Sequence, residues 1–199
     1  MKIRITPEFI LSLGLIFLSN RLETALIFLS AALVHELGHM TLLSLLGIKK
    51  PELSLGLLGA DIKADTSRLS YGEEALVYLG GILFNALATG VCTLCLRHSF
   101  DMRIMLFCLA NILYALFNLL PVKHLDGGRV LECALLSRLD DLWLADRILT
   151  AVSVTASLTL AVLSVYITLS LGASVSLITL TLWSFYQCIP SKPFCRSTS

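Results

Sequence analysis

The sequence predicts an all-α polytopic membrane protein with about six transmembrane helices and a short β-hairpin between the second and third helices. Composition is the first reason, because 56% of the 199 residues are apolar and only 15% are charged. The second is that the apolar residues form long stretches, most of them near the roughly 20 residues that a spanning helix needs. The third is that no stretch suits a second soluble domain, so residues 1–199 are expected to form one membrane-embedded domain.

Six apolar stretches mark the expected helices. The first follows Lys2 and Arg4 but lacks a small-residue cleavage site, so we expect a retained helix rather than a removed signal peptide. It is short, and whether it crosses the whole bilayer stays open. The last two come from one uncharged run that is long enough for a helical hairpin with a turn near Gly172. The six segments cover about residues 7–19, 24–47, 75–96, 104–120, 148–170 and 173–189.

The basic residues predict the orientation. With six crossings, both termini and the loops near 48–74 and 121–147 lie on one side, which holds twelve of the fifteen Lys and Arg residues. Because Lys and Arg are enriched in cytosolic loops, we expect the termini and these loops in the cytosol. Within the first loop, residues 51–65 (PELSLGLLGADIKAD) partly alternate between apolar and small or polar residues, with turn candidates at Gly56 and Gly59. This pattern predicts the hairpin.

Charge and cysteine content argue against two other classes of protein. The formal net charge is +1 and the basic residues are scattered, so no nucleic-acid partner is expected. The six cysteines show no repeated paired spacing, and Cys92 and Cys95 form a single CxxC inside an apolar run. We therefore interpret the cysteines as small buried apolar residues rather than as disulfide partners or metal ligands.

The second apolar stretch contains three ionisable side chains, in AALVHELGHMTLLSLLG, residues 31–47. His35 and His39 are four residues apart, so on a helix they lie on one face and can reach one metal ion. Glu36 can then face the open position of the ion and accept a proton from a bound water, which is the HExxH arrangement of zinc hydrolases. A chance match and a histidine pair hydrogen-bonded between helices stay open as alternatives. A haem site is disfavoured because histidines one turn apart cannot take opposite axial positions.

A catalytic zinc site needs a third protein ligand, and residues 117–132 (FNLLPVKHLDGGRVLE) offer one. Asp126 precedes two glycines in a loop on the expected cytosolic side, where the backbone can turn sharply. His39 lies roughly 10 to 15 Å from the cytosolic end of its helix at about 1.5 Å per residue, so the loop can reach it. A turn-forming role for Asp126 stays open. His124 is a second candidate ligand, interpreted here as a loop histidine.

The pair of motifs, HExxH followed far downstream by FNLLPVKHLDGGRVL, resembles the site-2 protease family of intramembrane zinc metalloproteases. The resemblance covers about residues 7–138, the expected catalytic core, and leaves a C-terminal helical hairpin at about 148–189. It implies a compact sporulation-type member without PDZ or CBS domains. It also implies that one zinc ion per chain is the cofactor, and that the chain cleaves a transmembrane segment of a membrane-tethered substrate such as a transcription-factor precursor.

Residue by residue, the resemblance implies that His35, His39 and Asp126 bind zinc and that Glu36 is the catalytic base. The GILFN stretch, with Gly81 and Asn85, is similar to a third family motif, although Ile82 replaces the family's proline. The family also commonly has prolines where this chain has Lys123 and His124.

Polar residues in the apolar stretches are expected to line a cavity open to the cytosol. Asn85 and Asn118 are candidates for binding the substrate backbone or the developing oxyanion, and Asn111 is a further polar candidate. Hydrogen bonding between helices is the alternative role for all three.

The resulting expectation is a multi-pass protein of a bacterial cell membrane, with its active site opening to the cytosol. Its partners would be the lipid bilayer, a membrane-protein substrate and a regulatory membrane partner. A membrane metal-binding or transport protein that uses the same His/His/Asp cluster without hydrolysis is the rival class. A non-catalytic relative is a second rival, and Glu36 argues against it because zinc ligation does not require that residue.

Overall fold

The computed structural model describes residues 2–5, 22–48, 52–56, 59–63, 68–139 and 141–171. The chain divides into two compact units, Met1–Leu119 and Leu120–Ser199. Each unit is described by itself.

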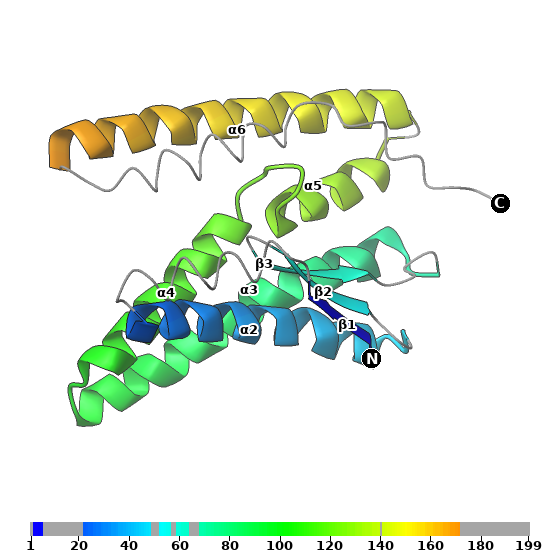
Figure 1. The fold of residues 1–199 in the computed structure, drawn as a ribbon. Helices are drawn as coiled ribbons and strands as arrows, with labels where there is room; N and C mark the ends of the chain where they lie inside the picture. Colours follow the sequence, from blue (N-terminus) through cyan, green and yellow to red (C-terminus); the bar gives the residue numbers. More distant parts are fainter. Residues whose placement is uncertain are drawn as a thin grey trace. The chain divides into compact units, whose positions relative to one another are not determined.

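A small sheet belongs to the first unit. Its strands are β1 (Lys2–Ile5), β2 (Glu52–Gly56) and β3 (Gly59–Lys63), in the order β1-β2-β3 (Figure 1). β1 pairs with β2 in parallel, and β2 pairs with β3 in antiparallel orientation with Gly56 opposite Gly59. Among the described strands, β2 is therefore central and β3 lies at one edge.

Three helices lie in the described part of this unit: α2 (Leu22–Leu45), α3 (Tyr71–His98) and α4 (Met102–Asn118). All three pack against one another, and β3 contacts α2. α3 begins with a capping box, in which the Ser70 hydroxyl accepts from the Glu73 N–H and the Glu73 carboxylate accepts from the Ser70 N–H. Asp101 is the N-cap of α4, and its carboxylate accepts from the Arg103 N–H. These caps explain why both helices start where they do.

Two glycines allow α2 and α3 to approach until their backbones touch. A Cβ atom added to Gly38 would collide with the carbonyl oxygen of Gly80, and one added to Gly80 would lie 2.8 Å from the carbonyl oxygen of Gly38. Any larger residue at either position would push the helices apart, because backbone atoms cannot move aside as a flexible side chain can.

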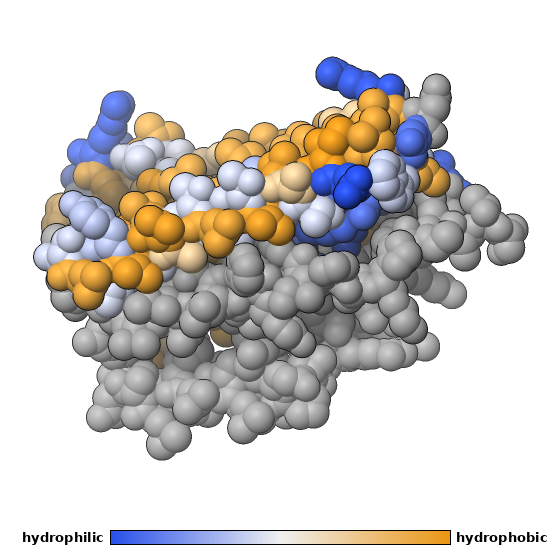
Figure 2. Space-filling model, turned by 90° about the horizontal axis from the view of Figure 1, so that it is seen from above, coloured by the Kyte–Doolittle hydropathy of each residue, from blue (hydrophilic) through white to orange (hydrophobic). Residues whose placement is uncertain are grey.

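The second unit contains α5 (Asp126–Leu136) and α6 (Leu142–Leu171), which pack against each other. α6 buries Ala145, Leu149, Ser153 and Ser157, which recur every four residues and so share one helix face. Its exposed residues include Val162, Tyr166 and Leu169. Figure 2 shows that the described part of the surface seen from above is mainly hydrophobic, with hydrophilic residues gathered towards its ends. This distribution suits a surface that faces lipid.

The fold class expected from the sequence is wrong in two respects. Within the described ranges, three helices rather than six are long and apolar enough to cross a membrane: α2, α3 and α6. α4 has 17 residues, which at about 1.5 Å per residue is shorter than the hydrocarbon core of about 30 Å. The expected segments at 7–19 and 173–189 lie outside the described residues.

The second error is that the described structure is not all-α. Alternation in residues 51–65 predicted a hairpin alone, whereas the sheet has a third strand, β1, from the start of the chain. Pairing of Lys2–Ile5 with Glu52–Leu55 joins segments about fifty residues apart, which local patterning cannot reveal. The three apolar helices nevertheless agree with the expectation of an integral membrane protein.

Candidate metal centre

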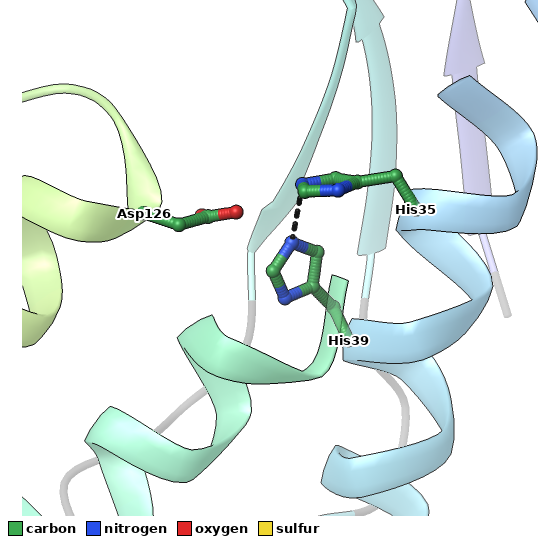
Figure 3. Close-up of side chains that lie close together, drawn as sticks. All are labelled: His35, His39 and Asp126. Carbon is green, nitrogen blue, oxygen red and sulfur yellow. Dashed lines mark hydrogen bonds between the residues drawn. The ribbon is translucent and has the colours of Figure 1, made fainter. Parts of the chain in front are cut away.

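His35 and His39 lie on consecutive turns of α2, and both side chains are buried. Their Nε2 atoms are 3.1 Å apart (Figure 3), and the two rings are nearly perpendicular, with an interplanar angle of 83°. The four-residue spacing brings the rings together on one helix face, as the sequence predicted.

Hydrogen bonds fix the tautomer of both rings. The Nδ1–H of His35 donates to Oδ1 of Asn85, and the Nδ1–H of His39 donates to the carbonyl oxygen of Val77, each at 2.8 Å. Because a carbonyl oxygen can only accept, each Nδ1 carries the proton. Each Nε2 of a neutral ring therefore presents a lone pair, which is the form that binds a metal.

Two lone pairs that face each other at 3.1 Å repel unless a cation lies between them. A divalent ion would satisfy both nitrogens. Two nitrogens at about 2.0–2.1 Å from a tetrahedral metal are about 3.3 Å apart, close to the observed separation. The two rings thus fit a zinc-like ion.

Asn85 orients the ring of His35 by accepting its Nδ1–H. It is fully buried in α3, and its Nδ2 donates to the carbonyl oxygen of Ala31 at 3.2 Å and to Oδ1 of Asn111 at 3.0 Å. Asn111 is also fully buried and donates to the carbonyl oxygen of Phe107. With the bond from His35, both polar atoms of Asn85 are engaged, and the network connects α2, α3 and α4.

Gly81 leaves room for the two rings. A Cβ atom at this position would lie 2.5 Å from Cε1 of His35 and 2.6 Å from the Nε2 atoms of both histidines. Real Cβ atoms do not approach other heavy atoms so closely, so a side chain here would displace the rings. The sequence drew attention to Gly81 and Asn85 through the GILFN stretch, but Gly38 and Gly80 were missed because nothing local marks a helix contact.

Glu36 and Asn118, two further predicted site residues, lie on α2 and α4. Glu36 is buried on α2, next to His35. Asn118 donates from Nδ2 to the carbonyl oxygen of Tyr114 in its own helix. The substrate-binding role expected for Asn85 and Asn118 stays a prediction. Sequence reasoning also missed Tyr114, whose ring centroid lies 5.2 Å from that of His35.

Asp126 is the first residue of α5 and is partly buried, whereas His124 is exposed. Among the described residues, one group of at least three His, Cys, Asp or Glu side chains could hold a metal ion, and it consists of His35, His39 and Asp126. Each offers one ligand atom: an imidazole nitrogen from each histidine and a carboxylate oxygen from Asp126. Two imidazoles and one carboxylate match the three protein ligands of a catalytic zinc site with one open position.

No family model and no curated protein matches the sequence. Among solved structures, the chain is similar to the site-2 protease from Methanocaldococcus jannaschii, with 24% identity and a TM-score of 0.67 over 94% of this chain and 88% of that one. The resemblance predicted from the motifs is thereby confirmed at the level of the fold: the chain has the fold of a site-2 protease and carries a His/His/Asp cluster.

Proposed function

We propose that this chain is an intramembrane zinc endopeptidase that hydrolyses a peptide bond in or near a transmembrane segment of a membrane-tethered protein. One observation carries the proposal. Both histidines of HExxH donate through Nδ1, so both Nε2 atoms present lone pairs to one buried point beside Glu36. Such a pair suits a metal ligand set better than a structural contact between helices.

His35, His39 and Asp126 would hold the ion in this proposal, with one zinc per chain. When bound, zinc supplies Lewis acidity and makes water acidic enough to ionise near neutral pH. Glu36 takes the proton of the attacking water and returns it to the leaving amide nitrogen. Burial of the three ionisable residues in α2 keeps the reaction away from lipid and limits access to water.

The substrate must present an extended backbone, because the amides of an intact helix are already paired. We propose that β3 receives it by strand addition. β2 covers one side of β3, which leaves the other side as an edge of the described sheet. In a hairpin with a two-residue connection, the residues that flank the connection, here Gly56 and Gly59, bond to each other. Along an antiparallel strand, the N–H and C=O groups then point alternately towards the partner strand and away from it. Those of Ala60 and Ile62 therefore point away from β2, to the edge.

The basic residues favour an orientation with both termini and the active-site opening in the cytosol. The resemblance to the sporulation-type branch favours a bacterial cell membrane. A transcription-factor precursor anchored in the membrane would suit that orientation, and a regulatory membrane partner is also part of the proposal.

The test is co-expression with a single-span protein that carries a different tag at each end. Wild-type protein should release a tagged fragment, whereas Glu36→Gln should leave the substrate intact and still purify with zinc. The glutamine keeps the size of the side chain but cannot accept the proton. Cleavage by Glu36→Gln at the wild-type rate would refute the mechanism. Full zinc content without cleavage by either protein, across substrates of differing sequence, would favour a metal-binding or transport protein.

A further inference from the structure

The turn that precedes Asp126 is fastened to α6 through its main chain. The N–H of Lys123 donates to Oγ of Ser153 at 3.0 Å, and the same hydroxyl donates to the carbonyl oxygen of Pro121 at 3.3 Å. Ser153 is fully buried. One hydroxyl therefore satisfies a donor and an acceptor of a turn that lacks regular secondary structure, where the main chain has few partners of its own.

The side chain of Lys123 makes a second attachment. Its Nζ lies 2.6 Å from Oδ1 of Asp146 and 3.2 Å from Oγ1 of Thr150. Asp146, Thr150 and Ser153 are four and three residues apart, so they form one face of α6. The side chain of Lys123 is 27% exposed and that of Asp146 is 55% exposed. Because water reaches this ion pair in part, the pair adds little to the free energy of unfolding. Its main effect is to fix the position of the turn on α6.

The turn is also joined closely to the start of α5. The N–H of Leu125 donates to the carbonyl oxygen of Val122 at 2.8 Å, and Val122 is buried. A Cβ atom added to Gly128 would collide with this same carbonyl group. The first turn of α5 thus rests directly on the backbone of the turn. Because Asp126 lies between these contacts, its position follows the position of the turn on α6.

We propose that α6 sets the position of the Asp126 carboxylate through Ser153 and through the Lys123–Asp146 pair. These three are positioning residues, and α6 is then part of the catalytic apparatus as well as a membrane span. The inference rests on the proposed function, in which Asp126 is a zinc ligand. Residues that orient a metal ligand commonly change metal affinity about 10- to 100-fold when they are removed.

The experiment measures how fast purified full-length protein releases zinc to an excess of chelator. Ser153→Ala and Lys123→Met should each release zinc about tenfold faster than wild type. Cobalt-substituted protein should show a changed visible absorption spectrum in both variants, because that spectrum reports the coordination geometry. Lys123→Arg should restore the release rate and the spectrum, since it keeps a cation that Asp146 can bind. A role confined to stability would leave the spectrum unchanged.

Ser164→Ala is the matched control. Ser164 is a buried serine of α6 whose hydroxyl donates to the carbonyl oxygen of Ala161 in its own helix, so zinc release should match wild type. Combining Lys123→Met with Asp146→Asn should add little to either change alone, because both remove the same contact.

Asp126→Asn separates failure of this inference from failure of the proposed function. Faster zinc release by Asp126→Asn, together with wild-type release by folded Ser153→Ala and Lys123→Met, would overturn the role of α6 and leave the ligand assignment standing. Wild-type release by Asp126→Asn would overturn the ligand assignment itself, and the inference with it. If Ser153→Ala does not fold, Lys123→Met and its arginine counterpart decide the outcome, because Lys123 is partly exposed.

Discussion

The Nδ1 nitrogen of His35 lies 2.8 Å from Oδ1 of Asn85, fifty residues further along the chain. This contact sets the tautomer of His35 and turns its Nε2 towards His39. The metal-binding property of the first histidine therefore depends on a residue of α3 as well as on the HExxH motif.

Replacing Asn85 with leucine should weaken zinc binding. Asn85→Leu keeps a similar volume but removes the acceptor for His35 and the donor to Ala31 and Asn111. We expect zinc affinity to fall about 10- to 100-fold, and the free energy of unfolding to drop by about 1–3 kcal/mol for each buried group that loses its partner. Competition with a chelator and thermal unfolding measure the two effects.

Asn118→Leu is the matched control for that change. Its amide bonds to the Tyr114 carbonyl within α4, so zinc affinity should stay at the wild-type value. Loss of cleavage with full zinc content in Asn118→Leu would support the predicted substrate-binding role. Equal zinc affinity in Asn85→Leu and wild type would show that the contact with His35 is dispensable.

Gly81→Ala should displace the histidine rings. The added methyl group would lie 2.5 to 2.6 Å from atoms of both rings, so zinc content and cleavage should be largely lost. Gly90→Ala in the same helix is the control, because a Cβ atom there meets nothing within 4 Å. The control should keep zinc, and it should be at least as stable as wild type because alanine is the better helix former by about 1 kcal/mol. Metal analysis of both purified variants decides the question, and a fully zinc-loaded, active Gly81→Ala would contradict the geometry.

Asp126→Asn separates a ligand from a turn residue. Asparagine forms turns as readily as aspartate but is a neutral, weaker ligand. We expect zinc affinity and cleavage both to fall, measured by metal analysis and by fragment release. His124→Ala should leave zinc content unchanged, because His124 is exposed and outside the cluster. Full zinc in Asp126→Asn combined with loss in His124→Ala would transfer the ligand role to His124.

Ala60→Pro tests strand addition at β3. Proline removes the N–H that points to the sheet edge and leaves the pairing with β2 in place. We expect slower cleavage at unchanged zinc content. Ala60→Ser, which keeps the N–H, should cleave normally. Asp61→Pro should disturb the sheet itself, because Asp61 lies opposite Ser54 and the alternation of an antiparallel ladder directs its N–H towards β2. Cleavage by Ala60→Pro at the wild-type rate would exclude the edge as the substrate-binding element.

Local properties of the chain were readable from the sequence. Four-residue spacing alone places His35 and His39 on one helix face, because helix geometry depends on neighbouring residues only. Apolar stretches of suitable length predicted α2, α3 and most of α6 for the same reason. Two motifs with characteristic residues, HExxH and the segment around LDGG, were enough to predict the fold of a site-2 protease.

Contacts between distant segments were decided by the tertiary structure. The acceptors of the two Nδ1–H groups lie 50 and 38 residues from their histidines, and the glycine contact between α2 and α3 has no local signature. Parallel pairing of β1 with β2 and the attachment of Lys123 to α6 are equally non-local. A sequence pattern records which face of an element is apolar or polar, but the partner of that face depends on how whole elements pack. The sequence by itself therefore determined which residues can bind a metal, whereas packing decided which atoms of those residues are directed towards it.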